Sequence, residues 1–395
     1  MPTSNESIHE MSTAMNSNIA LKDEPLTAEA DAETSATEVA DIPILKKTAE
    51  QTVAFSTRVV NFLELTGLTW GIPITRLVAG EDLREQLKQL WLIMGIPIIA
   101  FLLFLALWDW SAAKVDTSLG SVPGPAVVWQ EAKNLLADHY REREKEAAFY
   151  QRQEKRNADK LAEDPNAEVS IRPYTGKPTF IDQIFTSLYT VFVGFFLATI
   201  IAVPLGIVCG LSSTVNSAIN PLIQIFKPVS PLAWLPIVTL VISSVYKVTD
   251  DSWFEKAFLT SAITVTLCSL WPTLINTAVG VASIDKDLRN VSKVLKLSWF
   301  KTVTKIVIPS ALPLIFTGLR LLLGVGWMVL IAAEMLAQNP GLGKFVWDEF
   351  QNGSSNSLAR IMVAVFTIGL IGFLLDRLML MIQKKVTWDR NAVIR

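Results

Sequence analysis

The 395-residue sequence contains few of the residues from which metal and redox sites are usually built. It has two histidines, His9 and His139, and two cysteines, Cys209 and Cys268, both of which lie inside apolar runs. This scarcity argues against a histidine metal site, and the cysteines fit small hydrophobic residues better than a disulfide or a metal pair. The sequence also lacks a G-x-x-x-x-G-K-[ST] pattern, so we expect no P-loop ATP site in this chain.

Charge is also scarce. Charged residues make up 18% of the chain, against about 25% in soluble domains. The formal net charge of −2 argues against a nucleic-acid-binding protein of the broadly basic kind. Hydrophobic residues reach 51% and come in long runs, with a mean hydropathy of +0.38. These runs predict an all-α integral membrane protein.

The N-terminal part differs from the rest. Residues 1–50 hold ten acidic and three basic residues in a Ser-, Thr- and Ala-rich context, which predicts a disordered acidic tail. The tail has no apolar core of the kind that a signal peptide needs. Residues 51–90 are mixed, and Glu64 and Arg76 argue against a span there. We predict an amphipathic interfacial segment on the cytoplasmic side, with a poor first span as the alternative.

Six membrane spans are predicted. Residues 91–108, WLIMGIPIIAFLLFLALW, form an 18-residue stretch without charge, which is long enough to cross the hydrocarbon core. An outer loop follows over residues 109–180. Residues 181–385 then form a five-helix core, with a basic cytoplasmic loop at 285–309 and a C-terminal tail at 386–395. The five further spans are expected at about 187–211, 225–246, 257–284, 310–336 and 361–382.

Basic residues predict the orientation. Lys286, Lys293, Lys296, Lys301 and Lys305 crowd the loop between the fourth and fifth spans. The positive-inside rule therefore predicts that this loop and both termini are cytoplasmic, and loops as long as 109–180 escape the rule. Within that outer loop, VPGPAVVWQEAKNLL predicts a helix against the membrane or the bundle. The charge-balanced stretch after it predicts a solvated helix, with a partner contact as the alternative.

The basic loop has an amphipathic pattern. If residues 285–300 are helical, Leu288, Val291, Leu295 and Trp299 share one face and the basic residues lie broadly opposite. Such a helix could anchor the chain to the membrane surface, or it could dock a soluble partner.

Several longer stretches resemble a known family. These are PVSPLAWLPIVTLV, LWPTLINTAVGV, NVSKVLKLSWFKTVTKIVIPSALPLIFTGLRLLLGVGWMVLIAAEML and GLGKFVWDEF. They resemble the permease subunits of nitrate-type ABC importers, whose relatives carry bicarbonate, cyanate, taurine or alkanesulfonates. The resemblance covers roughly residues 91–385. The cytoplasmic-loop pattern of such permeases is E-A-A, three residues, Gly, nine residues and I-x-L-P. It is degenerate here, with Asn290, Val291 and Ser292 at the E-A-A positions and Lys296 at the glycine position.

The resemblance implies a six-helix type I importer transmembrane domain in the bacterial cytoplasmic membrane. It implies a second permease copy, separate ATPase subunits that hold ATP and Mg²⁺, and a periplasmic or lipid-anchored binding protein. The chain itself is then no enzyme and binds no cofactor. The residues expected to couple to the ATPase are Asn290, Val291, Lys293, Leu295, Lys296, Leu297 and Pro309. Pro309 is expected to end the loop before the next span.

A translocation path is predicted from prolines and deep charges. Pro231 and Pro236 flank Trp234 in the third span, which predicts either a broken helix at the path or a merely kinked packing helix. Arg320 lies well inside the fifth span and Glu334 lies near its outer end, and a charge inside a span should face a cavity or a partner. Arg320 either attracts a small anion or pairs with Asp376. Trp327 completes the predicted path.

The favoured substrate is nitrate or nitrite. Bicarbonate, cyanate, taurine and alkanesulfonates remain alternatives within the family. A secondary transporter is the alternative from another class, although six spans and a basic loop suit it poorly. Gly206 and Gly210 form a G-x-x-x-G in the second span, which predicts close helix packing.

Overall fold

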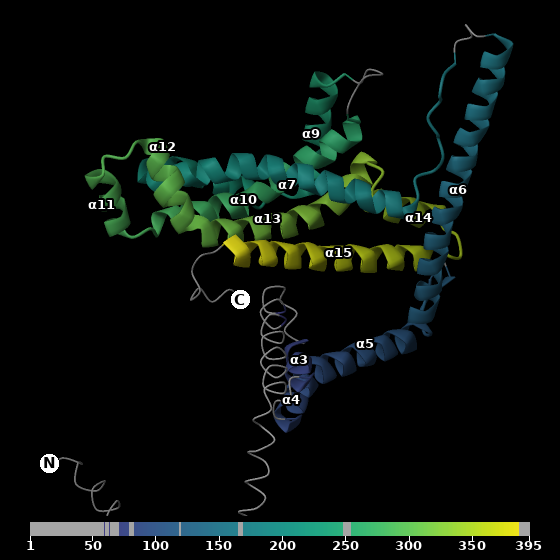
Figure 1. Cartoon of the computed structure of the whole chain (residues 1–395), viewed down its shortest axis with the longest axis horizontal. Coiled ribbons are helices and arrows are strands. Elements are labelled where there is room, and N and C mark those ends of the chain that lie inside the picture. The colour runs from purple at the N-terminus through teal and green to yellow at the C-terminus, as the bar shows by residue number, and fades with distance from the viewer. Residues whose placement is uncertain are drawn as a thin grey trace, which may run out of the picture.

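The computed structural model describes residues 59, 63, 71–78, 83–117, 120–164, 169–247 and 254–386. The predicted tail at 1–50 lies outside these residues, and so does the predicted tail at 386–395 except for Val386, which ends the last helix. The described chain is almost entirely helical, so the all-α prediction is confirmed (Figure 1). A two-residue antiparallel pair, β1 (Asp116–Thr117) and β2 (Gly120–Ser121), interrupts the helices. The helices are α3 (Ile72–Val78), α4 (Leu83–Leu90), η2 (Trp91–Gly95), α5 (Ile96–Ala112), α6 (Pro125–Glu163), α7 (Phe180–Leu211), α8 (Ser213–Phe226), α9 (Pro231–Val245), α10 (Lys256–Ala282), α11 (Lys286–Val294), α12 (Trp299–Thr302), η3 (Val303–Val307), α13 (Ile308–Ala337), α14 (Leu342–Asn352) and α15 (Ser357–Val386).

Within the described residues, five helices are long and apolar enough to cross a membrane, and α8 with α9 makes a sixth candidate. These two helices meet at an angle of 102°. The predicted single span at 225–246 is therefore wrong, because the chain breaks between Phe226 and Pro231. The break has a local cause. Pro228 lies within it, and the Ser230 hydroxyl accepts the N–H of Leu232 at 3.3 Å to cap the new helix, in which Pro231 is the first residue.

The first span begins earlier than predicted. One continuous helix runs from Leu83 to Ala112, through the π-helical turn η2. None of its most apolar stretch is buried in the chain. Figure 1 shows α5 diverging from the bundle, and it touches α15 near its outer end, where the rings of Trp108 and Phe366 lie 5.2 Å apart. Most of α5 is therefore left for lipid or for another subunit.

The helices α7, α10, α13 and α15 run side by side (Figure 1). A small residue recurs every fourth position along α7, at Gly194, Ala198, Ala202, Gly206 and Gly210. A Cβ on Gly206 would lie 2.7 Å from Thr277 Cβ, and one on Gly210 would lie 2.5 Å from Val281 Cβ. The prediction of close packing at this G-x-x-x-G is confirmed, because only glycine lets the backbones of α7 and α10 approach so far.

Helix α6 crosses the end of the bundle at a steep angle (Figure 1). Val128 and Leu135 are buried beside Phe180 and Phe345, so the outer loop packs on the bundle as predicted. Leu136, the next residue, is exposed. The charge-balanced second half is helical, as predicted, and carries i,i+3 ion pairs such as Lys145–Glu142 at 3.1 Å.

Candidate functional site

The basic loop at 285–309 begins with a helix that is shorter than predicted. Helix α11 begins after Asp285, whose carboxylate accepts the N–H of Asp287 at 3.1 Å, and ends at Val294. Lys296 then adopts a φ of +47°. The N–H of Lys296 bonds to Lys293 O at 3.1 Å, and that of Leu297 bonds to Ser292 O at 3.0 Å. This pair of hydrogen bonds is typical of a helix C-terminus in which one residue, usually glycine, adopts the left-handed backbone conformation.

The turn explains the glycine of the family pattern. Lys296 occupies the glycine position and also takes the left-handed conformation that glycine tolerates best. A side chain there costs roughly 1–2 kcal/mol. The continuous helix predicted over 285–300 is wrong, because this turn ends α11 and changes the direction of the chain before Leu297. Leu295 and Trp299 therefore do not extend the apolar face of α11.

Pro309 also differs from its predicted role. One helix runs from Trp299 to Ala337, and Pro309 lies inside it. The π-helical turn η3 ends at Val307, two residues before the proline. Widened turns of this kind accommodate a residue that cannot donate a backbone hydrogen bond. The span therefore begins in the loop itself, without a stop at Pro309.

The other six predicted coupling residues gather at α11 and its turn. Asn290, Val291 and Lys293 lie on α11, and Leu295, Lys296 and Leu297 form the turn. The apolar side chains of this segment are uncovered in this chain, so they do not rest on its own bundle. Leu295 is 63% exposed. The other exposed apolar side chains of the segment are Leu288, Val291, Val294, Trp299 and Phe300.

Arg320 binds Asp376 of α15 through two parallel contacts. Its Nε lies 2.5 Å from Oδ1, and its Nη2 lies 2.9 Å from Oδ2. Such bidentate pairs are the strongest of the ordinary ion pairs. The pair borders a cavity of about 220 Å³ between α13 and α15, which Trp327 also lines. Of the two predicted roles for Arg320, the geometry matches the internal ion pair.

Glu334 lies at another place in the bundle. It is fully buried, and its carboxylate accepts the Ser187 hydroxyl of α7 at 2.8 Å and the N–H of Gly343 at 3.0 Å. The same Ser187 Oγ accepts the N–H of Leu342 at 2.9 Å. Glu334 therefore caps the start of α14 from outside the helix, where a negative charge is stabilised. Although 14 residues separate it from Arg320, the two side chains contact different helices.

The aromatic residues of the broken helix form a third group. The ring of Phe226 lies 5.7 Å from that of Trp234 and 6.3 Å from that of Trp271. The indole N–H groups of Trp234 and Trp271 are buried and find no acceptor in the described part of the chain. Pro231 starts α9, and Pro236 is exposed on it. Arg320 and Trp327 of α13 bond to α15, at Asp376 and at the carbonyl oxygen of Ile368. Helices α9 and α15 lie on opposite sides of the bundle (Figure 1), so these two side chains point away from α9 and the structure does not bring all the predicted path residues together.

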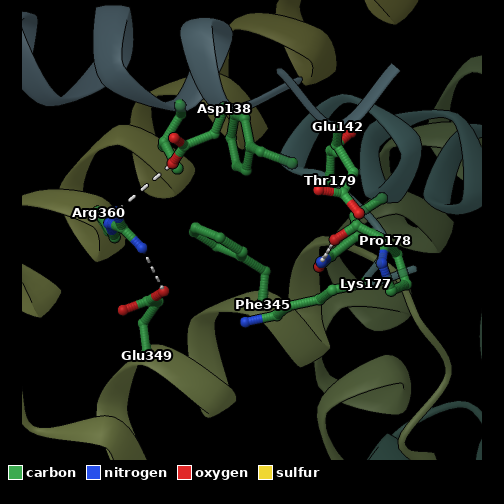
Figure 2. Close-up of a pocket in the computed structure, with 11 residues that line it drawn as sticks. Asp138, Glu142, Lys177, Pro178, Thr179, Phe345, Glu349 and Arg360 are labelled. Carbon is green, nitrogen blue, oxygen red and sulfur yellow. Dashed lines mark hydrogen bonds and ion pairs between the residues drawn. The ribbon is translucent and has the colours of Figure 1, made fainter. Parts of the chain in front are cut away.

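A charged pocket lies where α6 meets the core (Figure 2). Arg360 of α15 reaches Glu131 at 2.7 Å, Glu349 at 3.3 Å and Asp138 at 3.7 Å. Glu131 and Glu349 are buried, and the Ser357 hydroxyl also donates to Glu349 at 3.0 Å. These contacts tie α6 to α14 and α15 at one point.

The sequence interpretation missed this network. Arg360 stands out only as a charge at the border of the last span. The residue that could have revealed the network in the sequence is Glu131, which falls on the same helical face as Val128 and Leu135. A carboxylate on an apolar face needs a buried partner, and only the fold identifies Arg360 as that partner.

Comparison with known proteins places these features in a family. Residues 202–388 match the family described as the binding-protein-dependent transport system inner membrane component. The nitrate import permease protein of Synechococcus elongatus is 37% identical over 205 residues, which are 52% of this chain and 69% of that protein. The bicarbonate transport system permease protein of the same organism is 38% identical over 203 residues, which are 51% of this chain and 68% of that protein. Among solved structures, an inward-facing methionine ABC transporter aligns over 53% of this chain and 96% of its own, with a TM-score of 0.45 and 14% identity.

Proposed function

The chain belongs to the family of binding-protein-dependent transport system inner membrane components, and on that premise we propose that it forms the membrane path of an ATP-driven importer of nitrate or nitrite. The coarser statement, a permease subunit of an ABC importer, follows from the family. The single observation that supports nitrate is the 37% identity to a nitrate import permease. A bicarbonate permease is as similar, so bicarbonate is the second candidate.

The physical chemistry of the bundle is compatible with a small monovalent anion. The deep arginine, Arg320, is already paired with a carboxylate, so it adds little net positive charge. The indole N–H groups of Trp234 and Trp271, which find no acceptor among the described residues, are neutral donors near the break between α8 and α9. Neutral donors can replace part of the hydration of a weakly hydrated anion without trapping it. We therefore assign the path to the α9–α10 side of the bundle, with Trp234, Pro231 and Pro236 beside it.

We further assign α11 and its turn to the contact with the ATPase. In α11 and its turn, exposed apolar side chains lie beside lysines, next to the helix that continues into a span. Such a surface suits contact with a soluble partner better than packing on the chain's own bundle. The exposed apolar side of α9, with Leu240 and Val245, is assigned to a second copy of the permease. The termini and α11 are assigned to the cytoplasm of a bacterium by the basic residues of the loop.

The ATPase contact predicts a strong effect at the turn. Leu295→Asp should remove the ATPase subunit from the purified complex, because it puts an unpaired charge into a contact that must shed water. We expect at least a tenfold loss of co-purified ATPase and of ATP-driven uptake. Quantitative co-purification and uptake into proteoliposomes measure these two effects.

Leu83→Asp provides the matched control. Leu83 of α4 is 64% exposed, against 63% for Leu295, and it also lies on the predicted cytoplasmic side. This control should keep the ATPase bound. Full retention of the ATPase by Leu295→Asp would disprove the assignment of the turn, and so would labelling of a cysteine at Lys293 from outside intact cells.

The substrate is tested by uptake of labelled nitrate in cells without other nitrate transporters, with and without this chain. Uptake should require ATP and the cognate binding protein, and nitrite should compete with nitrate. Unchanged nitrate uptake together with loss of bicarbonate uptake would reassign the substrate within the family. Uptake without any ATPase would instead favour a secondary transporter.

A further inference from the structure

Two cavities lie between α5 and α15, near the point where α5 meets the start of α6 (Figure 1). The first, which we call the polar cavity, has a volume of about 320 Å³ and is bordered by Asp109, Gly124, Ser355 and Asn356 among others. The second, the apolar cavity, has a volume of about 280 Å³ and lies closer to the middle of both helices. Neither cavity belongs to the proposed transport path or to the ATPase contact.

The two cavities differ in the chemistry of their walls. Apart from Ser111, the apolar cavity is lined by apolar and aromatic side chains, namely Phe104, Leu107, Trp108, Met362 and Phe366. The polar cavity is bordered by two carboxylates and by Ser121, Ser355 and Asn356. A polar site at the end of two membrane helices, with an apolar site deeper between the same helices, follows the order of headgroup and acyl chain in a phospholipid.

Asp109 brings an unpaired carboxylate to the polar cavity. Its side chain makes no hydrogen bond or ion pair within the described part of the chain. The other carboxylate, Glu131, is already bound to Arg360 at 2.7 Å. Lysine, arginine and histidine are absent from the described residues that border the cavity. Lys114, the nearest lysine in the sequence, lies over the Trp110 ring at 3.6 Å instead. The carboxylate of Asp109 is therefore available to a cationic group from outside the chain.

The start of α6 borders the same cavity and offers hydrogen-bond donors. Helix α6 has no side-chain cap, and its residues Ala126 and Val127 line the cavity. The first N–H groups of a helix have no partner within it, and the partial positive charge there favours an anion. A Cβ at Gly124 would overlap the Asp109 carboxylate, so that carboxylate lies beside the start of α6. A ligand that joins a cation to a phosphate matches both features better than a simple cation does.

The polar cavity lies where lipid headgroups are expected. The uncharged run of α5 ends at Trp108, one residue before Asp109. The rings of Trp110 and Trp129 are exposed, as is typical of tryptophan at a membrane–water interface. None of the most apolar stretch of α5 is buried in the chain. A soluble zwitterion would leave the apolar cavity uncovered, whereas a phospholipid covers both cavities.

We propose that the two cavities bind one phospholipid whose headgroup carries a primary amine, as in phosphatidylethanolamine. Its ammonium binds Asp109, its phosphate accepts from the first N–H groups of α6, and an acyl chain lies in the apolar cavity beside Phe104. Phosphatidylcholine has no N–H to donate to Asp109, and phosphatidylglycerol has no cation. The inference goes beyond the proposed function, because it requires only that α5 and α15 lie in a membrane.

Asp109→Asn tests the headgroup site. The purified complex with its ATPase is stripped of lipid in detergent and titrated with dioleoyl phosphatidylethanolamine or dioleoyl phosphatidylcholine, and native mass spectrometry measures the affinity of the first lipid bound. We expect the wild type to bind phosphatidylethanolamine roughly three- to tenfold more tightly, because only this lipid donates hydrogen bonds to the carboxylate. Asp109→Asn should bind the two lipids alike. Asp116→Asn is the matched control, since Asp116 is also exposed but borders neither cavity, and it should keep the preference.

A second variant fills the polar cavity. Ala126 is exposed at the start of α6, so Ala126→Phe should lower the affinity for phosphatidylethanolamine at least threefold and leave the melting temperature of the complex unchanged. Equal affinities of the wild type for the two lipids would overturn the proposal, and so would a preference that survives Asp109→Asn. Tighter binding of dioleoyl phosphatidylglycerol would overturn the role of the amine. If Ala126→Cys resists labelling in the lipid-free complex, a second copy of the chain covers the cavity and no lipid site exists there. Each of these results leaves the proposed function standing.

Discussion

Arg320→Leu should abolish transport and lower the amount of folded protein in the membrane. The substitution leaves the Asp376 carboxylate without the guanidinium that binds it through two contacts. Removing one partner of a buried pair costs about 3–5 kcal/mol. The side chains of Arg320 and Asp376 are 28% and 36% exposed, so we expect the lower part of this range. Thermal unfolding of the detergent-purified complex and uptake into proteoliposomes measure the two effects.

The Lys344–Asp348 pair of α14 is a matched control. Its side chains are 29% and 34% exposed, close to the values for Arg320 and Asp376, but it joins the residues through one lysine nitrogen within a short helix. Lys344→Leu should therefore lower the free energy of unfolding by less than about 1 kcal/mol.

The double variant with leucine at residues 320 and 376 should regain folded protein, relative to Arg320→Leu alone. Regained transport would assign Arg320 to packing alone, and wild-type transport by Arg320→Leu would contradict the importance of the pair.

Gly343→Ala should lower the stability of the protein more than any other replacement by a small residue in the part of the bundle where α13 meets α14. A Cβ at Gly343 would overlap the backbone carbonyl oxygen of Ile331 and press on the Cβ of Glu334. The obstructing atom belongs to the backbone of α13, so no side-chain rotation relieves the overlap. Overpacking of this kind costs about 1–3 kcal/mol or more. It would also lengthen the bond from the N–H of Gly343 to the Glu334 carboxylate, which is now 3.0 Å.

Gly369→Ala is the control for glycine replacement. A Cβ at Gly369 meets no atom within 4 Å, and the residue lies inside α15. Alanine should be neutral or slightly stabilising there, because it favours the helix by up to about 1 kcal/mol over glycine. The two variants are compared by the melting temperature of the purified complex. Equal melting temperatures would show that α13 and α14 are not packed as tightly as the Glu334 contacts require.

The sequence predicted the spans because the membrane imposes a simple rule on it. A run such as residues 91–108 must be helical in lipid, since every backbone group has to bond within its own segment. The same reasoning located the helix of the outer loop, where Val128 and Leu135 share a face. The break at residues 227–230 could also have been predicted from the sequence, because prolines are frequent there. The angle between α8 and α9 could not have been predicted, since the packing of these helices sets the direction in which each one continues.

Side-chain partners were harder to predict than elements. Arg320 could equally have faced a path or Asp376, and the spacing to Glu334 suggested a shared face that the fold does not use. A helix surface predicts which residues lie together on one side. It does not predict which neighbour covers each turn of that side, because successive turns of α13 meet different helices.

The sequence by itself determined the membrane class, the helical runs, the basic loop and the family. Each of these depends on composition or on the order of residues along one segment. The tertiary structure alone decided that Glu334 caps α14, that Arg360 joins α6 to the core, and that Lys296 takes the left-handed turn that ends α11. The physical reason is that a buried charge or a turn is stabilised by groups far along the chain, and only packing brings those groups within hydrogen-bonding distance.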